Sequence, residues 1–377
     1  MSLSKGLYVC VAISATVTAW YYPRWRDSKI RAQLPVDIDT WRFPGKNREA
    51  EERVWMVFAP VLARYGLVSW ACFEHSIQHP PDGEYPRYNG YRHIPVFDAQ
   101  RGGPLKAFQR WQYVNPVNRA VRSHDGQDFI CRVIVVKGHG SNALQALRRL
   151  ATGLNAFRSD NHVLPMLREI HFQDITCGLF PITGESMAES FGPDRTRYIQ
   201  NSVGDLLDMF IQAFEALVFI HAEKVAHRDA FYDNFLVQWR PQSIRAQQIP
   251  CSRPRVYLID FETAICFPED SVNEDCTCIG HPFGNIDNYA RPTIRAVGEG
   301  KPYNPFILDV WQLSYHLAFL ETSIPELDEV LLGLRARRTA SEVLKCLAGA
   351  VASLTPEMLH VSPTYRDQVG GRPFYIV

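Results

Sequence analysis

Residues 226–239 read AHRDAFYDNFLVQW, and residues 255–264 read RVYLIDFETA. The first run contains Asp229 and, five residues later, Asn234, whereas the second is an apolar stretch that ends in Asp260 and Phe261. Phosphoryl transfer needs few protein groups, because one carboxylate meets the attacking hydroxyl while an amide oxygen and a second carboxylate hold metal ions on the phosphates. The two runs supply these groups in that order, so they form a candidate site.

The sequence before these runs predicts a small sheet with one helix. Asp125-Gly126 is a typical hairpin turn, and it joins predicted strands over residues 118–121 and 128–136. The second strand ends on Lys137. A helix is predicted next, over 143–154, and two further strands follow it, over 166–172 and 175–181.

After residue 181 the apolar residues recur at helical spacing. The clearest stripe spans residues 203–218 and leads into the run with Asp229. Residues 49–70 also predict a helix, whose apolar run Gly66 is expected to end. Clustered Pro, Gly and Tyr predict an irregular segment over 76–105. Short strands are predicted at 235–239 and 256–259, and later helices at 306–320, 327–334 and 339–354. We therefore expect an α+β fold in which a small antiparallel β-sheet lobe with one helix precedes a larger, mainly helical lobe.

This arrangement resembles the protein kinase superfamily, and it is similar in particular to the divergent kinase-like domains of mushroom-forming fungi. The resemblance covers residues 108–355 and implies a bilobal protein-kinase-like fold. Residues 64–67 read RYGL and are similar to a turn that often precedes the lobe in that fungal group. The helix that starts with Asp309 matches the one that anchors the catalytic loop, and RRTA at 337–340 resembles a later element whose proline is missing.

The resemblance also implies roles for four residues. Asp229 is expected to be the catalytic base, and Asn234 and Asp260 are expected to hold Mg²⁺ on the phosphates of ATP. Lys137 matches the strand lysine that pairs the α- and β-phosphates. The expected cofactors are therefore ATP and Mg²⁺.

The regions that should bind nucleotide depart from the kinase pattern. The stretch WQYVNPVNRAV at 111–121 has no glycine where a phosphate-covering loop would carry several. No acidic residue lies between Gly138 and Ser159, although a kinase holds the equivalent of Lys137 with a glutamate from this helix. These departures count against ordinary kinase catalysis.

The catalytic segment departs from the pattern as well. Glu262 follows Asp260-Phe261 where a glycine is usual, and Phe231 stands where serine/threonine kinases usually have lysine. Ala290-Arg291-Pro292 is the nearest match to the end of the activation segment, and it lacks the acidic residue.

Three functions fit these observations. The first is an active, atypical protein kinase, because all four transfer groups are retained. The second is a pseudokinase, a nucleotide-binding or scaffolding protein with little or no catalysis. The third is a small-molecule phosphotransferase on the same fold. The partner would be a protein substrate or a scaffolding partner, whose identity the sequence does not give.

The composition is that of an ordinary globular protein. Forty basic residues balance forty acidic ones among 377, so bulk charge predicts no nucleic-acid partner. The nine cysteines are odd in number and favour reduced thiols in the cytoplasm over a disulfide framework. Cys276 and Cys278 near His281 are a weak zinc pattern, because no second cysteine pair accompanies them.

The N-terminus allows several interpretations. Leu7–Tyr22 is uncharged and mostly apolar, but it is shorter than the ~20 residues of a spanning helix. It could be a membrane anchor, a signal peptide, or an arm packed on the domain, and an anchor would leave the rest of the chain cytoplasmic. We expect four segments. Residues 1–48 would form an anchor and linker, and 49–107 an extension packed on the kinase-like domain. Residues 108–182 would form the N-lobe and 183–377 the C-lobe.

Overall fold

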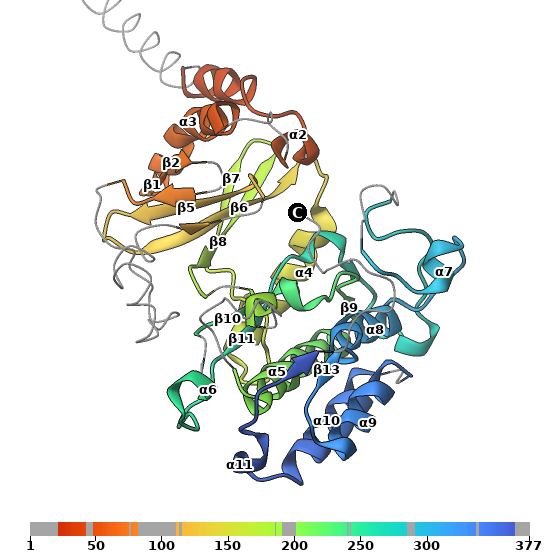
Figure 1. Cartoon of the computed structure of the whole chain (residues 1–377). Helices are drawn as coiled ribbons and strands as arrows, with labels where there is room; N and C mark the ends of the chain where they lie inside the picture. The colour runs from red at the N-terminus through yellow and green to blue at the C-terminus, as the bar shows by residue number, and fades with distance from the viewer. Residues whose placement is uncertain are drawn as a thin grey trace, which may run out of the picture. The chain divides into compact units, whose positions relative to one another are not determined.

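The computed structural model has a mixed α+β architecture, with an antiparallel sheet and several helices (Figure 1). It divides into two compact units. Unit 1 is formed by the described parts of 1–87, 108–139 and 169–179, and unit 2 by those of 88–107, 140–168 and 180–377. The described residues are 22–42, 48–74, 77–81, 111–112, 115–184, 186–190, 201–239, 241, 243–284, 291–336 and 339–365.

A five-stranded sheet organises unit 1, with the strand order β1-β5-β6-β8-β7. The predicted hairpin is confirmed: β5 (Asn118–Ser123) pairs antiparallel with β6 (Asp128–Val136), and Gly126 in the turn has a positive φ of 82°. Such a φ is readily reached only without a Cβ atom. The other strands are β1 (Leu67–Ser69), β7 (Arg168–Phe172) and β8 (Ile175–Pro181).

The helix predicted over 49–70 is shorter than expected. Helix α3 spans Arg48–Arg64, and residues 67–69 form strand β1 instead. Gly66 has a φ of 74°, which ends the helix and turns the chain so that Leu67 pairs with Ser123. The end of the apolar run at Gly66 is confirmed, but the predicted range was wrong for residues 67–69, because they pair with β5, a strand distant in the sequence.

The segment before the sheet supplies much of the core of unit 1. Trp41 on α2 (Ile38–Arg42) and Trp55 and Phe58 on α3 are fully buried and meet edge to face, with ring centroids 5.7–6.0 Å apart. Residues 22–31 are helical too, where the sequence analysis predicted a linker. The aromatic cluster packs against Val117, which lies just before β5, and against buried strand residues, among them Val121, Val133 and Ile170.

A second, three-stranded sheet belongs to unit 1. Its order is β2-β3-β4, with β2 at Ala71–Glu74, β3 at Ile77–His79 and β4 at Trp111–Gln112. Strand β3 lies at the start of the segment predicted to be irregular. The remainder of that segment, from residue 82 onward, lies outside the described residues.

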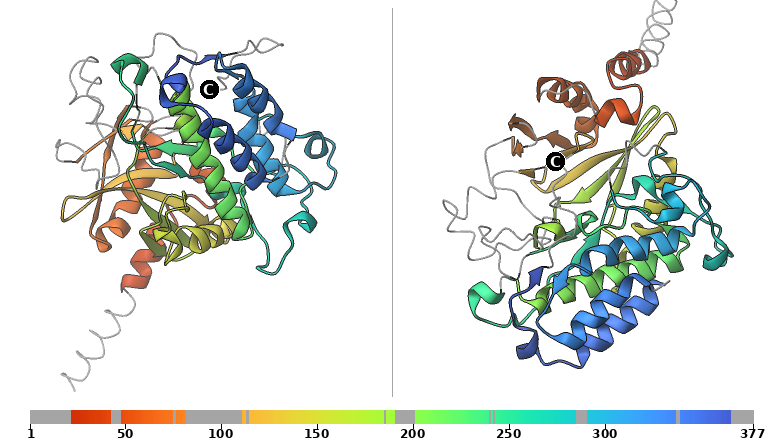
Figure 2. Two further views of the ribbon diagram at one scale, coloured as in Figure 1. Left: turned by 90° about the horizontal axis from the view of Figure 1, so that it is seen from below. Right: turned by 45° about the vertical axis from the view of Figure 1, so that its right-hand side comes forward.

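Long helices organise unit 2, as predicted. Helix α5 (Val203–Ala222) begins at a capping box in which Ser202 and Asp205 each bind the other's backbone N–H. It lies side by side with α10 (Ala340–Ala352), as Figure 2 shows, and it also contacts α8 (Pro305–Leu317). The predicted helix after residue 325 is α9 (Pro325–Gly333).

Helix α4 (Ser141–Leu150) and two short strand pairs complete the centre of unit 2. Strand β10 (Phe235–Val237) pairs with β11 (Val256–Leu258), as the sequence predicted. Strand β9 (Val225–Ala226) pairs with β12 (Ile265–Cys266). The shorter elements are η2 Asn155–Phe157, η3 Met187–Ser190, η4 Tyr232–Asn234, α6 Ser243–Ala246, η5 Phe261–Thr263, η6 Asn273–Asp275, α7 Arg295–Gly298, β13 Leu320–Glu321, η8 Leu334–Ala336, α11 Pro356–Leu359 and β14 Thr364–Tyr365.

Some predicted features fall outside the described residues. These are residues 7–21 of the apolar N-terminal segment, Ala290, and Arg337 and Arg338. Among the helices that the structure describes, none combines the length and the apolar character needed to cross a membrane.

Candidate functional site

The run with Asp229 is held by a buried aspartate on helix α8. Asp309 accepts backbone N–H bonds from His227 at 2.8 Å and from Arg228 at 2.6 Å. It also pairs with the ring of His221 at 2.9 Å. Arg228 has a φ of 67°, which an arginine adopts only when its surroundings impose it. Asp309 therefore fixes the turn that presents Asp229.

Gln312, one helical turn further along α8, fixes the same turn from its other side. Its side-chain amide donates to the carbonyl of Arg228 at 2.9 Å and accepts the N–H of Ala230 at 2.8 Å. The backbone is thus held immediately before and after Asp229. Sequence reasoning did not single out Gln312, although a polar residue three positions after Asp309 on an apolar helix was an available signal.

Asn234 connects Asp229 to the second run. Its Nδ2 donates to the backbone oxygen and to Oδ2 of Asp229, both at 2.7 Å. Its own carbonyl accepts the N–H of Ile259 at 3.0 Å, next to the pairing of β10 with β11. Asp260 is the next residue. The structure therefore brings three of the four predicted site residues together within unit 2.

Further contacts join the two runs. His227 Nε2 lies 2.9 Å from the carbonyl of Ile259, and Thr263 Oγ1 donates to the carbonyl of His227 at 2.7 Å. The ring of Phe261 is buried and meets that of His227 edge to face at 4.9 Å. Asp260, between Ile259 and Phe261, has a left-handed backbone with φ 67° and ψ 63°. Aspartate tolerates this region better than most residues do.

The carboxylate of Asp229 lies in an environment that disfavours its charge. Burial raises the pKa of Asp229 to about 6, and the negative charges of Asp233 and Asp260 act in the same direction. The positive charge of Arg291 opposes this rise, and the interaction with His227 acts in the same direction as Arg291. A carboxylate with a raised pKa is a stronger base than an exposed aspartate, which suits general-base chemistry near neutral pH.

Arg291 reaches the site from a segment far along the chain. Its Nε lies 3.1 Å from Asp229 Oδ1, and its Nη1 lies 2.7 Å from Asp233 Oδ1. The guanidinium also lies over the ring of Phe231, 5.0 Å from its centroid. Sequence reasoning noted Arg291 only as part of a degenerate motif, and nothing in the local sequence indicated which carboxylates it would meet.

The oxygen atoms of the site fit a magnesium ion. The amide nitrogen of Asn234 is turned toward Asp229, and the amide oxygen of Asn234 and the carboxylate of Asp260 are the hard ligand types that Mg²⁺ prefers. The described residues contain no group of three or more His, Cys, Asp or Glu side chains that could hold a metal ion. Two protein ligands suit Mg²⁺, which is commonly bound by one or two carboxylates together with substrate phosphates.

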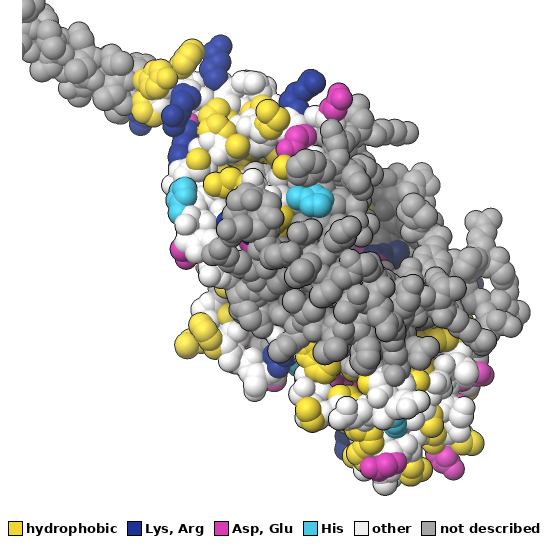
Figure 3. Space-filling view, turned by 60° about the vertical axis from the view of Figure 1, so that its left-hand side comes forward, with side chains coloured by type: hydrophobic (Ala, Val, Ile, Leu, Met, Phe, Trp, Pro, Cys, Tyr) yellow, Lys and Arg dark blue, Asp and Glu magenta, His cyan; other side chains and the backbone are white. Residues whose placement is uncertain are grey.

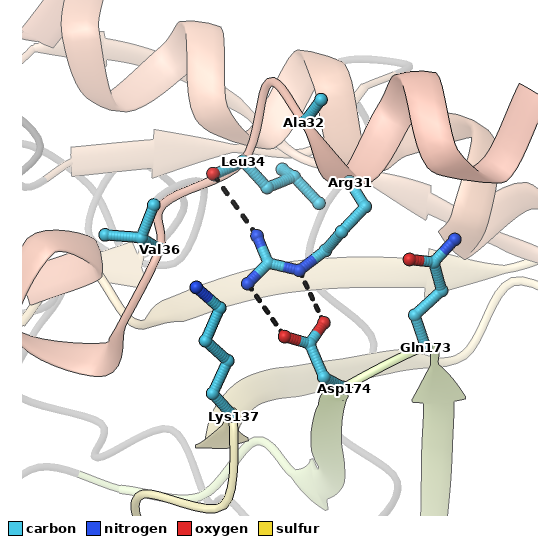
Figure 4. A pocket seen from close by; sticks show the side chains of 7 residues that line it. All are labelled: Arg31, Ala32, Leu34, Val36, Lys137, Gln173 and Asp174. Carbon is cyan, nitrogen blue, oxygen red and sulfur yellow. Dashed lines mark hydrogen bonds and ion pairs between the residues drawn. The ribbon is translucent and has the colours of Figure 1, made fainter.

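Lys137 lies in unit 1 and has a different set of neighbours. It is exposed, follows the last residue of β6, and has a φ of 50°. Its N–H donates to the carbonyl of Asp174 at 3.0 Å. Figure 4 shows its side chain at a pocket of about 330 Å³ lined by Arg31, Ala32, Leu34, Val36, Gln173 and Asp174.

An ion pair forms part of this pocket. Arg31 donates from Nε and Nη2 to the two carboxylate oxygens of Asp174, the second bond being 3.0 Å long. Hydrogen bonding to Arg31 lowers the pKa of Asp174, and the charge of Lys137 adds to this effect. Helix α4, which follows Lys137 in the sequence, has the sequence SNALQALRRL and offers no carboxylate.

Comparison with known protein-family models gives no match for this chain. A search of curated proteins gives no match either. The site is therefore interpreted from its own residues and geometry.

Proposed function

We propose that this chain is an atypical protein kinase with a bilobal, protein-kinase-like fold, which transfers the γ-phosphate of ATP to a protein hydroxyl. One observation carries the proposal. Asn234 binds the side chain of Asp229 through its amide, and its backbone carbonyl accepts the N–H of Ile259, the residue before Asp260, whose charge acts on Asp229. An amide and two carboxylates are the set of groups that phosphoryl transfer requires.

In the proposed reaction the hydroxyl oxygen of the substrate attacks the γ-phosphorus of ATP. A bond forms between that oxygen and phosphorus, and the bond from phosphorus to the β–γ bridging oxygen breaks, so that ADP leaves with the electron pair. The hydroxyl proton passes to the carboxylate of Asp229. This residue is 5% exposed, and the backbone N–H groups of its neighbours Arg228 and Ala230 are bound by α8. A fixed base of this kind acts through positioning as well as through proton affinity.

Asn234 and Asp260 would hold Mg²⁺ in this site. When bound, the ion supplies positive charge that neutralises the phosphate oxygens during transfer. Lys137 is assigned to the ATP phosphates by the resemblance to protein kinases, and its exposed ammonium is chemically suited to that role. A protein substrate is favoured over a small molecule because the Asp309 helix resembles that of protein kinases. Asp309 and Gln312 on this helix bind four backbone groups of the catalytic loop.

The test is phosphoryl transfer by the purified full-length chain, with Mg²⁺ and ATP labelled at the γ-phosphate. We expect transfer by the wild type, and loss of transfer in Asp229→Asn and when Mg²⁺ is chelated. Asp270→Asn is the matched control, because Asp270 is an exposed loop aspartate outside the site. Unchanged transfer in Asp229→Asn would exclude Asp229 as the base.

A pseudokinase that binds nucleotide without transfer is the second candidate. It is favoured by helix α4, which has no acidic side chain to hold a lysine, and by Glu262 in η5, which follows Asp260. A thermal-shift titration with Mg-ATP separates the two functions, since a ligand that binds the folded state raises its melting temperature. A shift without any turnover supports the pseudokinase, whereas transfer that depends on Asp229 supports the kinase.

A further inference from the structure

Asp229 is held by two side chains, one on each carboxylate oxygen. Asn234 donates to Oδ2 at 2.7 Å, and Arg291 Nε lies 3.1 Å from Oδ1. We propose that Arg291 is a positioning residue for Asp229, which fixes the plane of the carboxylate and the direction of its proton-accepting lone pairs. This inference rests on the proposed phosphoryl transfer, and it assigns a role to a residue outside the catalytic loop.

Two anchors are needed because a carboxylate rotates easily about its last side-chain torsion. The torsion between an sp³ and an sp² carbon has a broad minimum, so one hydrogen bond leaves the plane of the group loosely defined. A bond to each oxygen defines that plane. Asn234 lies five residues after Asp229 in the same loop, whereas Arg291 comes from a segment 62 residues further along the chain, and both belong to unit 2.

The loop around Asp229 also holds Arg291 in place. Asp233, one residue before Asn234, binds Nη1 of the arginine at 2.7 Å. Phe231, which is buried, supports the flat face of the guanidinium at 5.0 Å. Arginine suits this position, because its planar fork can bind two carboxylates and stack on a ring at once.

The local sequence explains why the cation comes from elsewhere. Two residues after Asp229 the chain places Phe231, whose side chain is 1% exposed and carries no charge. Pro292 follows Arg291, and a residue before proline is confined to extended backbone. This restricts the direction from which the Arg291 side chain leaves the chain.

During transfer, the proton of the substrate hydroxyl passes to Asp229 as the new oxygen–phosphorus bond forms. Arg291 takes no part in bond making. It keeps the accepting oxygen pointed at the hydroxyl, and displacement of a reacting group by ~1 Å is enough to reduce a rate by ~100-fold. Loss of Arg291 is therefore expected to reduce turnover more than nucleotide binding.

The first experiment is steady-state kinetics of full-length Arg291→Met and Arg291→Lys. Methionine keeps the apolar stem over Phe231 and removes the charge and the donors. We expect kcat of Arg291→Met to fall by roughly 10- to 100-fold with KM for ATP within about twofold, and Arg291→Lys to recover part of the loss. Arg295→Met, whose side chain is 90% exposed on the same segment, is the matched control and should retain wild-type kinetics.

Several kinetic results would overturn the proposal. A kcat for Arg291→Met that equals or exceeds that of the wild type would show that the contact is dispensable or inhibitory. A change confined to KM would show a binding role. An equal loss in Arg295→Met would show a general effect of this segment.

The second experiment does not depend on turnover. Melting temperatures are measured for Arg291→Met, Asp229→Asn and the double variant. If the two side chains interact as described, the shift caused by Arg291→Met in the wild type is reduced or reversed in the Asp229→Asn background. If the melting-temperature shifts of the two single variants simply add in the double variant, the two side chains do not interact and the proposal is wrong. If the wild type transfers no phosphate at all, the proposed function is wrong, and the cycle still decides whether Arg291 holds Asp229.

Discussion

The backbone N–H of Arg228 donates to the carboxylate of Asp309 over 2.6 Å, and this single bond joins a left-handed residue to the middle of helix α8. Left-handed backbone in a large residue costs on the order of 1–3 kcal/mol. Hydrogen bonds to a charged group contribute about 1.5–3 kcal/mol each, and Asp309 accepts two from the loop. The turn before Asp229 therefore depends on α8.

Replacement of Asp309 should weaken the fold of unit 2 as well as the site. Asp309→Asn keeps the shape of the side chain but removes its charge and turns an acceptor into a donor that faces the N–H groups of His227 and Arg228. We expect the free energy of unfolding to fall by about 2–4 kcal/mol, as measured by urea denaturation. Asp270→Asn should leave the urea unfolding midpoint unchanged from that of the wild type. An Asp309→Asn midpoint equal to that of Asp270→Asn would contradict the role of Asp309.

His316 predicts a pH dependence of stability. Burial, and then the charges of Arg291 and Arg335, lower the pKa of His316 to about 3. Its ring stacks on Tyr232 with 3.6 Å between centroids, and Tyr315 meets it edge to face. In the unfolded chain the His316 ring takes up a proton with a pKa near 6.5, whereas in the folded chain it does so only near pH 3. The stability that the neutral, buried ring contributes is therefore fully present above about pH 6.5 and is lost as the pH falls toward 3.

Between pH 6.5 and 5 this loss amounts to roughly 2 kcal/mol, because each unit contributes about 1.36 kcal/mol. His316→Gln cannot titrate, and we expect its stability to change less over this range when urea midpoints are compared at several pH values. His124→Gln, at an exposed turn, is the control. Parallel curves for the wild type and His316→Gln would show that His316 is not the group responsible.

Helix α3 should behave as part of the core of unit 1 and not as a removable extension. Phe58 is fully buried against Trp41, Trp55 and Phe172. Phe58→Ala is expected to cost about 3–5 kcal/mol in the free energy of unfolding, since it removes apolar contacts and leaves a cavity. Met56→Ala, on the same helix but 66% exposed, should cost less than about 1 kcal/mol. Similar costs for the two variants would show that α3 is not packed in the core.

The start of the described chain suggests contact with a membrane surface. In the helical stretch 22–31, Tyr22 and Trp25 are more than half exposed, and Lys29 Nζ lies 5.7 Å from the centre of the Trp25 ring. Figure 3 shows hydrophobic and basic side chains next to each other at this end. Aromatic and basic residues beside an apolar segment such as Leu7–Tyr22 are typical of a membrane interface.

We therefore propose that the full-length chain binds vesicles that contain phosphatidylserine. It should sediment with them more strongly than with neutral phosphatidylcholine vesicles, because each basic residue near an anionic surface contributes about 1 kcal/mol. Trp25→Ser should weaken the binding. Phe157→Ser, which removes an exposed aromatic ring from unit 2, should not. Equal binding to both kinds of vesicle, or none, would count against a lipid role for this stretch.

The sequence predicted the elements whose patterns are local. Apolar spacing was sufficient for α5, α8 and α10, and Asp125-Gly126 was sufficient for the hairpin of β5 and β6. The motif spacing also selected Asp229, Asn234 and Asp260, which do lie together. Each of these features depends on residues that are neighbours along a helix or on two strands that pair with each other.

Features that depend on distant contacts were not predicted. Residues 67–69 became a strand because β5 was available to pair with them, and no local pattern states that. Arg291 meets Asp229 only after the segment between them has folded, and Gln312 acts through backbone groups that any sequence would provide. Long-range partners of this kind are fixed by packing and not by propensity.

The tryptophans of the aromatic cluster give the molecule a built-in optical probe. Trp41, Trp55 and Trp70 are all buried in unit 1, whereas the long helices α5, α8 and α10 belong to unit 2 and contain many of the helical residues. Indole emission is therefore weighted toward unit 1, although Trp239 and Trp311 lie in unit 2, and far-ultraviolet circular dichroism mainly reports the helices of unit 2. Curves that do not coincide would mean that the two halves of the chain lose their structure independently.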